Sequence, residues 1–267
     1  MAEMLTERVR ANARELKLLG LAENLDDLVK RAEDAHLGYR QFLDLLLEEE
    51  VGVVEGRRYN SRLKLSGLPY RKTLSEFDAA FQPELDPKRL SELGTLRFIE
   101  RKVNALILGP PGVGKTHIAV GVAMEALRRG YLVRYIALDD LVRDLRKADQ
   151  LGKLREKLSH YQRPQLLICD EVGYLPLDRE DANRFFQLVN RRYTKGSMIV
   201  TSNKRVSEWA ELFGEEVLAA AILDRLLHDA EVLTINGPSY RLRGRLEVVQ
   251  SEVVQSKVGE AEEEASD

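Results

Sequence analysis

Residues 105–116 read Ala105-Leu106-Ile107-Leu108-Gly109-Pro110-Pro111-Gly112-Val113-Gly114-Lys115-Thr116. A short apolar run leads into a glycine-rich turn of the pattern G-x-x-x-x-G-K-T, and a stretch with helical periodicity follows it. Glycines let the backbone N–H groups of such a turn approach a phosphate, and the N-terminus of the following helix adds the positive end of its dipole. A turn that merely joins a strand to a helix does not need all of these fixed positions. The stretch therefore predicts a phosphate-binding loop in an α/β domain.

The polar residues of this loop have separate expected roles toward ATP and Mg²⁺. Lys115 supplies a full positive charge to the β- and γ-phosphates, and Thr116 offers a hydroxyl ligand for Mg²⁺. We expect the neighbouring His117 to cap the nucleotide site or to pack near it. The residues expected to bind ATP are Gly109, Pro110, Pro111, Gly112, Val113, Gly114, Lys115, Thr116 and His117.

Two further apolar runs end in polar residues that suit the same chemistry. The run 166–169 is followed by Asp170, which we expect to hold Mg²⁺ through water, and by Glu171, which we expect to orient or polarise the attacking water. The run 198–200 leads through Thr201 and Ser202 to Asn203, a candidate contact for the γ-phosphate or the lytic water. Taken alone, without the other motifs, Asn203 is better interpreted as an ordinary turn residue.

From residue 103 onward, short apolar runs alternate with longer helical patterns, which indicates βα units around a parallel five-stranded sheet with helices on both faces. The predicted strands are residues 103–108, 132–137, 166–169, 197–201 and 231–235. The predicted helices between them are residues 115–129, 140–161, 179–193 and 215–227. Asp86 and Pro87 resemble an N-cap and a first helical residue, and they predict a further helix from 87 to about 101.

The rest of the chain divides by composition into a helical N-terminal domain, a linker and a tail. Residues 3–50 carry apolar positions at helical spacing, which predicts two or three amphipathic helices within a small domain, 1–66. Prolines interrupt helical periodicity in the next stretch, so we predict a linker at 67–86 and the α/β domain at 87–246. Residues 247–267 are acidic and poor in aromatic residues, which predicts a disordered tail.

Composition excludes several classes of protein. The 267 residues are 44% hydrophobic and 32% charged, as expected of a folded domain. A single cysteine and four scattered histidines exclude a disulfide scaffold and a zinc finger. The N-terminal residues do not resemble a signal peptide, and no apolar run approaches the roughly 20 residues of a membrane span. We therefore expect a cytoplasmic protein with no membrane partner.

Taken together, these motifs resemble the AAA+ branch of P-loop ATPases, and within it the IstB-type transposition helpers and the related DnaC-type helicase loaders. The resemblance covers residues 10–245 and is most specific at 109–117 and at 170–176. Residues 170–176 are the stretch most similar to IstB. Further matches are residues 201–203, 221–226 and 239–243.

The resemblance implies an ATPase whose site is completed by a neighbouring copy in a ring-shaped or helical homo-oligomer. Lys115, Thr116, Asp170, Glu171 and Asn203 would act within one subunit. Arg225 would be an arginine finger that reaches the next subunit's γ-phosphate, because a planar and permanently charged guanidinium neutralises transition-state charge. A plainer alternative is that Arg225 pairs with Asp224 or Asp229. Either Arg241 or Arg243 could serve as a sensor of the nucleotide, and the sequence leaves the choice open.

The resemblance also implies double-stranded DNA and a transposase as partners. Two basic windows are candidate phosphate contacts, and neither carries a base-reading motif. The residues we select are Arg57, Arg58, Arg62 and Lys64 in the first window, and Lys147, Lys153 and Arg155 in the second. The first window has few compensating acids, which favours DNA contact, whereas acids interspersed in the second favour a solvated helix face with i,i+4 ion pairs.

Two other functions remain open at this point. A helicase loader would prefer single-stranded DNA and would use its N-terminal helices to hold a helicase. A nucleotide-gated DNA-binding scaffold would bind ATP as an assembly switch and hydrolyse it negligibly. The similarity of residues 170–176 to the transposition helpers favours a transposition helper over a helicase loader.

Overall fold

The computed structural model describes residues 2–174 and 176–243, and it divides the chain into two compact units. The first unit ends at Lys64 and the second begins at Leu65. The predicted tail 247–267 and the last residues of the predicted α/β domain, 244–246, lie outside the described residues.

The first unit consists of helices. α1 spans Ala2–Glu15, α2 spans Leu19–Asp34, and α3 spans Tyr39–Ser66, so that its last two residues belong to the second unit. The N-terminus of α2 packs against the middle of α3: the Leu21 N–H donates a hydrogen bond to Glu50 Oε2 at 3.1 Å. Leu25 and Leu28 of α2 are buried. The three helices agree with the prediction of two or three amphipathic helices in this region.

The second unit is built on one parallel sheet, as predicted. Its strands are β1 (Ala105–Leu108), β2 (Val133–Ala137), β3 (Leu166–Val172), β4 (Ser197–Ser202) and β5 (Glu231–Thr234). They lie in the order β2-β3-β4-β1-β5, and every neighbouring pair is parallel. All residues of β4 are buried, which explains why its centre is a continuous apolar run, 198–200, rather than an alternating pattern.

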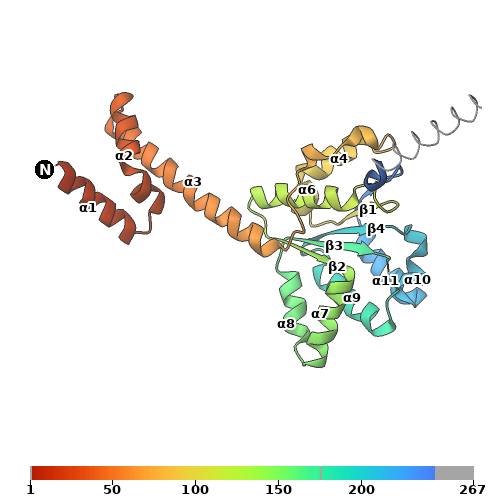
Figure 1. Cartoon of the computed structure of the whole chain (residues 1–267). Helices are drawn as coiled ribbons and strands as arrows, with labels where there is room; N and C mark the ends of the chain where they lie inside the picture. Colours follow the sequence, from red (N-terminus) through yellow and green to blue (C-terminus); the bar gives the residue numbers. More distant parts are fainter. Residues whose placement is uncertain (1, 175, 244–267) are drawn as a thin grey trace, which may run out of the picture. The chain divides into compact units, whose positions relative to one another are not determined.

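Helices cover both faces of this sheet (Figure 1). On one side lie α4 (Pro87–Thr95) and α6 (Lys115–Arg128). On the other side α7 (Leu138–Gln150), α9 (Arg179–Arg192), α10 (Trp209–Phe213) and α11 (Glu216–Leu227) bury their apolar faces against the sheet in one hydrophobic core. The structure therefore has the α/β layering that the alternating sequence pattern predicts.

Two stretches that the sequence predicts as single helices are each divided into two helices in the structure. The stretch 87–101 is divided into α4 and α5 (Arg97–Glu100) by Leu96, which adopts a left-handed φ of 65° and is fully buried. The stretch 140–161 is divided into α7, which begins at Leu138, and α8 (Leu154–Gln162). Gly152 lies between them with a φ of 68°, a conformation that costs glycine little and ends a helix.

Residues 67–86, which the sequence predicts as a linker, contain two short 3₁₀ turns, η1 (Leu74–Glu76) and η2 (Ala79–Phe81). The first of them, η1, packs on the N-terminal half of α6, where a Cβ added to Gly121 would lie 2.8 Å from Leu74 Cδ2. This segment, which we call the strap (residues 70–82), forms one wall of a pocket at the start of α6.

Among the described residues, no helix is long and apolar enough to cross a membrane.

Candidate active site

The glycine-rich loop lies where β1 ends and α6 begins, at the carboxyl edge of the sheet where ligands of open α/β sheets bind. Gly114 is the N-cap of α6 and has a φ of 101°. A Cβ at this position would lie 2.6 Å from a ring carbon of Phe77 in the strap, so both the backbone angle and the space require glycine. The N-terminus of α6 therefore faces a pocket with its backbone N–H groups available to an anion.

Lys115 lies over this loop. Its ammonium donates hydrogen bonds to the carbonyl oxygens of Gly109 at 2.7 Å and Pro110 at 2.8 Å. Burial lowers the pKa of this ammonium below that of an ordinary lysine, and Asp170 opposes the shift. The structure thus places a positive charge directly above the loop that the sequence predicts to cradle phosphates.

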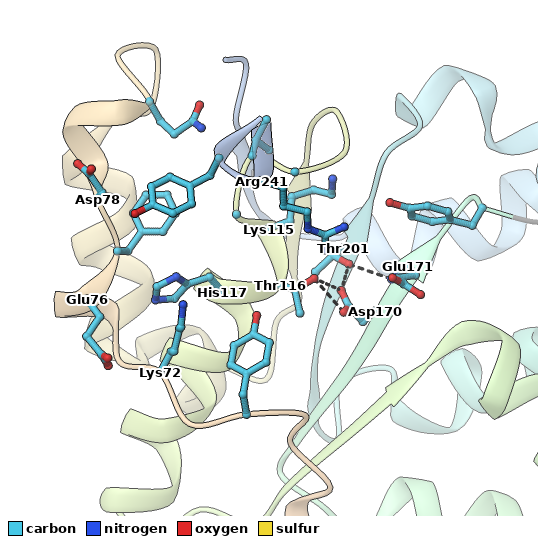
Figure 2. Close-up of a pocket in the computed structure, with 18 residues that line it drawn as sticks. Lys72, Glu76, Asp78, Lys115, Thr116, His117, Asp170, Glu171, Thr201 and Arg241 are labelled. Carbon is cyan, nitrogen blue, oxygen red and sulfur yellow. Dashed lines mark hydrogen bonds between the residues drawn. The ribbon is translucent and has the colours of Figure 1, made fainter. Parts of the chain in front are cut away.

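Hydroxyl groups from three elements converge on the buried carboxylate of Asp170. Thr116 of α6 donates to both of its oxygens, at 3.2 Å for Oδ1 and 3.0 Å for Oδ2. Thr201 of β4 donates to Oδ1. Tyr135 of β2 donates to Oδ2 at 2.5 Å. Figure 2 shows Thr116, Thr201 and Asp170 at one end of the pocket, joined by these hydrogen bonds.

This donor set fits Mg²⁺. A hydroxyl and a carboxylate are hard oxygen donors, which this ion prefers, and a few such protein ligands suffice because Mg²⁺ keeps several waters. Thr116 and Asp170, the two predicted metal ligands, are in direct contact. Groups of three or more His, Cys, Asp or Glu residues able to hold a metal do not occur in the part of the chain that the structure describes.

Glu171 follows Asp170 in a local irregularity of β3, where the register with β4 shifts between Cys169 and Val172. It has a left-handed φ of 64°, which is costly for a residue with a side chain. Its backbone N–H donates to Thr201 Oγ1 at 3.0 Å, and its side chain is exposed at the edge of the pocket. Backbone strain at such a position commonly accompanies a functional role.

Most of the residues predicted to bind ATP, to bind Mg²⁺ or to act in catalysis line this one pocket. They are Gly112, Val113, Gly114, Lys115, Thr116, His117, Asp170 and Glu171. His117 Nε2 lies 3.0 Å from the carbonyl oxygen of Thr73, and its ring packs edge-on against Phe77. Gly109, Pro110 and Pro111 belong to the same loop but are not among the described residues that line the pocket.

Asn203 lies just beyond β4 and is not among the described lining residues of this pocket. Its Oδ1 atom is buried and has no hydrogen-bond partner among the residues that the structure describes. The same atom would lie 3.0 Å from a Cβ added to Gly173, so Asn203 sits beside the chain segment that follows Glu171.

The strap and the C-terminal segment supply further walls of this pocket. Tyr70, Lys72, Glu76, Phe77, Asp78 and Gln82 come from the strap, and Tyr240 and Arg241 come from the other end of the described chain. Sequence reasoning missed the strap residues, because the strap has no periodic pattern. Tyr240 and Arg241 lie within the matched stretch 239–243, where Arg241 is one of the two candidate sensors of the nucleotide. Arg241 lies in the pocket near Lys115 (Figure 2), whereas Arg243 donates to Asp78 at 2.9 Å. The structure thus separates the two arginines that the sequence leaves equivalent.

Arg225 lies away from this pocket, in the last turn of α11. Its guanidinium donates to Asn190 Oδ1 and to the carbonyl oxygen of Ala221, both at 2.9 Å, and stacks over the Phe186 ring. Among the described residues it forms no ion pair, so the alternative pairing with Asp224 or Asp229 is wrong.

The candidate DNA-binding residues fall into two groups. Arg57, Arg58 and Lys64 are exposed on the C-terminal half of α3, and Arg62 is partly buried there. In the second window, the structure separates paired cations from unpaired ones. Arg143, Arg146 and Lys157 form ion pairs with nearby aspartates. Lys147, Lys153 and Arg155 are exposed and make no ion pair with any described residue.

Comparison with known proteins places these observations in a family context. The model of the family described as "IstB-like ATP binding protein" matches residues 11–248. The chain is 47% identical over 237 residues to the ATP-binding protein of insertion sequence IS5376 from Geobacillus stearothermophilus, covering 89% of this chain and 94% of that protein. It is 46% identical to the ATP-binding protein of insertion sequence IS21 from Pseudomonas aeruginosa, covering 85% of this chain and 86% of that protein.

Solved structures share the fold of the second unit. The crystal structure of DnaI matches with a TM-score of 0.51 and 25% identity, covering 63% of this chain and 90% of that one. The replication initiator DnaA bound to AMPPCP and single-stranded DNA matches with a TM-score of 0.53 and 22% identity, covering 69% of this chain and 56% of that one.

Proposed function

The chain belongs to the IstB-like ATP-binding protein family, and from this premise we propose that it is an ATPase that assembles on double-stranded DNA and recruits or activates a transposase. The observation that carries the ATPase part is the meeting of Thr116 with Asp170 at 3.0 Å, beside Lys115 and Glu171. Residues from α6 and β3 thereby bring a metal site, a phosphate-binding charge and a candidate base to one pocket.

Each residue has a definite task in this proposal. The N–H groups at the start of α6 and the Lys115 ammonium bind the β- and γ-phosphates and neutralise charge that develops on them. Thr116 and Asp170 would hold Mg²⁺, which supplies further charge stabilisation on the phosphates when bound. Glu171 accepts a hydrogen bond from the attacking water and orients it toward the γ-phosphate. Asn203, which lies just beyond the described lining of this pocket, would contact the γ-phosphate or that water when the nucleotide is bound.

A shared site explains the position of Arg225. Its guanidinium is held by Asn190 and Ala221, outside its own pocket, so it reaches a γ-phosphate only in a neighbouring copy. Hydrolysis would then depend on assembly into a ring-shaped or helical homo-oligomer, because each site needs an arginine from the next subunit. Arg241, which lies in the pocket, is our candidate for the arginine that senses the nucleotide within one subunit.

The family and the basic surface support the proposed partners. The similar proteins are named ATP-binding proteins of insertion sequences, which supports a transposase as partner. Exposed cations on α3 and on the segment around α8 suit the phosphates of duplex DNA. Contacts to phosphates release bound counterions, so binding should depend steeply on salt. Such contacts carry no sequence information, so binding should depend little on sequence.

The test is ATP hydrolysis by the purified full-length protein alone, with duplex DNA and with single-stranded DNA at equal nucleotide concentration. Particle size is followed in the same samples by light scattering. We expect duplex DNA to stimulate hydrolysis and ATP to drive assembly on it. A preference for single strands would instead support a helicase loader. ATP-dependent assembly without turnover would indicate a nucleotide-gated scaffold.

A further inference from the structure

We propose that the Tyr135 hydroxyl is a positioning group of the Mg²⁺ site: it fixes the orientation of the Asp170 carboxylate that would hold the ion. The inference rests on the proposed ATP- and Mg²⁺-binding function. Tyr135 precedes Asp170 by 35 positions in the chain and lies in β2, outside the motifs that predict the site. A positioning residue acts through its neighbour, so its removal should change how the ion binds rather than remove a ligand.

The register of the sheet places Tyr135 within reach of Asp170. Tyr135 of β2 lies opposite Ile168 of β3, and Ala137 lies opposite Asp170. Side chains two residues apart on a strand share one face, so Tyr135 and Asp170 form a diagonal pair on the same face of the sheet. A tyrosine is long enough to span this diagonal, and the small side chain of Ala137 leaves room for it. The resulting O–H···O distance is 2.5 Å.

The hydroxyl donors divide the two carboxylate oxygens between them. Thr201 donates to Oδ1 and Tyr135 donates to Oδ2, from opposite neighbours of β3, while Thr116 lies against both oxygens. Bonds on both oxygens prevent the carboxylate from rotating about its Cβ–Cγ bond. The edge that faces Thr116 is therefore the edge that remains for the ion and its waters.

The phenol is suited to act as a donor. Its hydroxyl carries one proton, and in this contact it donates that proton to Asp170 Oδ2. Partners of this kind commonly matter to metal sites: their removal typically costs about 10- to 100-fold in metal affinity. Replacement by phenylalanine removes only the donor and leaves the ring in place.

The structure offers a matched control. Tyr161 is fully buried, and its hydroxyl donates to Asp144 Oδ2 at 2.6 Å, a tyrosine–carboxylate bond of almost the same length. Neither Tyr161 nor Asp144 is among the described residues that line the pocket of Lys115 and Asp170. Tyr161→Phe therefore removes a comparable hydrogen bond from the same unit without touching the proposed metal site.

The experiment measures the affinity of full-length wild type, Tyr135→Phe and Tyr161→Phe for fluorescent N-methylanthraniloyl-ADP, in EDTA and in a MgCl₂ series. The readout is the ratio of the Kd in EDTA to the Kd in saturating MgCl₂, together with the Mg²⁺ concentration at which half of this change in affinity is reached. Because both Kd values come from the same preparation, a partly unfolded variant changes the signal amplitude but not the ratio. Stability is measured separately by urea unfolding.

We expect Mg²⁺ to tighten nucleotide binding in wild type and in Tyr161→Phe, and Tyr135→Phe to need about tenfold more Mg²⁺ for the same effect. Affinity in EDTA should be similar in all three proteins. An unchanged Mg²⁺ dependence in Tyr135→Phe would overturn the inference and leave the proposed function intact. An absence of any Mg²⁺ effect in wild type would instead count against the proposed function itself.

Discussion

The hydroxyl of Ser239 occupies the space in which a side chain at Gly112 would lie. A Cβ built on Gly112 would stand 2.0 Å from Ser239 Oγ, and the next residue, Tyr240, donates its backbone N–H to the Gly112 carbonyl at 3.0 Å. The phosphate-binding loop is therefore packed directly under a segment from the far end of the described chain. Gly112 is required here for two reasons, its φ of 84° and the absence of a Cβ.

Gly112→Ala should weaken nucleotide binding by about tenfold or more, because the added methyl group must displace either Ser239 or the loop. Gly130→Ala is the control: Gly130 has a φ of 89° and nothing within 4 Å of an added Cβ, so it suffers the same backbone strain without a clash. Both variants should lose about 1–2 kcal/mol of unfolding free energy from that strain. Titration with N-methylanthraniloyl-ADP and urea unfolding separate the two effects. Equal nucleotide affinity in the two variants would contradict this account of Gly112.

Glu171→Gln should abolish turnover and preserve ATP binding. The amide keeps the size of the side chain but no longer accepts a proton, and loss of a general base typically costs about 100-fold or more in kcat. Glu211→Gln, at an exposed position of α10, changes the net charge equally and should hydrolyse ATP like wild type. Phosphate release and ATP affinity are measured in parallel. Equal slow turnover in wild type and Glu171→Gln would favour the scaffold function.

The sheet and the carboxyl-edge cluster are predictable because their determinants are local. β1, β3 and β4 are largely buried on both faces, so each contains an unbroken apolar run, at 105–108, 166–169 and 198–200. Parallel strands end at one edge, which brings the residues after those runs together. Thr116 and Asp170 meet for this reason, although 54 positions separate them in the chain.

The features of the fold and the site that the sequence does not predict depend on contacts between segments that are far apart in the chain. The helix break at Leu96 cannot be predicted from a residue type that rarely adopts a positive φ. The strap has no periodicity of its own, and its position reflects the contact of Phe77 with the phosphate-binding loop and the bond from Arg243 to Asp78. The bond from Tyr135 to Asp170 requires the order and register of β2 and β3, which the sequence pattern does not encode.

Arg57→Gln combined with Arg58→Gln should weaken binding to duplex DNA uniformly across sequences. Both side chains are exposed on α3, and the removal of each phosphate contact lowers the dependence of log Kd on log salt concentration by about one. We therefore expect the slope to decrease by up to about two. The control, Arg14→Gln with Arg40→Gln, removes the same charge at exposed positions outside the basic window. Fluorescence anisotropy over a salt series measures the slopes, and equal slopes for the two double variants would exclude this window as a DNA contact.

Mixing two inactive variants tests whether Arg225 acts on a neighbouring subunit. Arg225→Ala keeps Glu171 but has no guanidinium to offer, whereas Glu171→Gln keeps Arg225 and lacks the base. Each variant alone should hydrolyse ATP at no more than about 1% of the wild-type rate, since an arginine finger contributes about 10³- to 10⁵-fold and a general base about 100-fold or more. In mixed assemblies, an Arg225→Ala site beside a Glu171→Gln subunit has every group it needs, so activity should return.

The control mixture combines Glu171→Gln with Lys115→Ala, in which no site is complete and activity should stay absent. If Arg225 serves only the fold, through its bonds to Asn190 and Ala221, the first mixture should remain as inactive as the control. Urea unfolding of Arg225→Ala alone shows how much of its defect arises from those two hydrogen bonds, which we expect to be worth about 1–3 kcal/mol together. If hydrolysis returns in the first mixture and not in the control mixture, the arginine of one subunit must complete the site of another subunit.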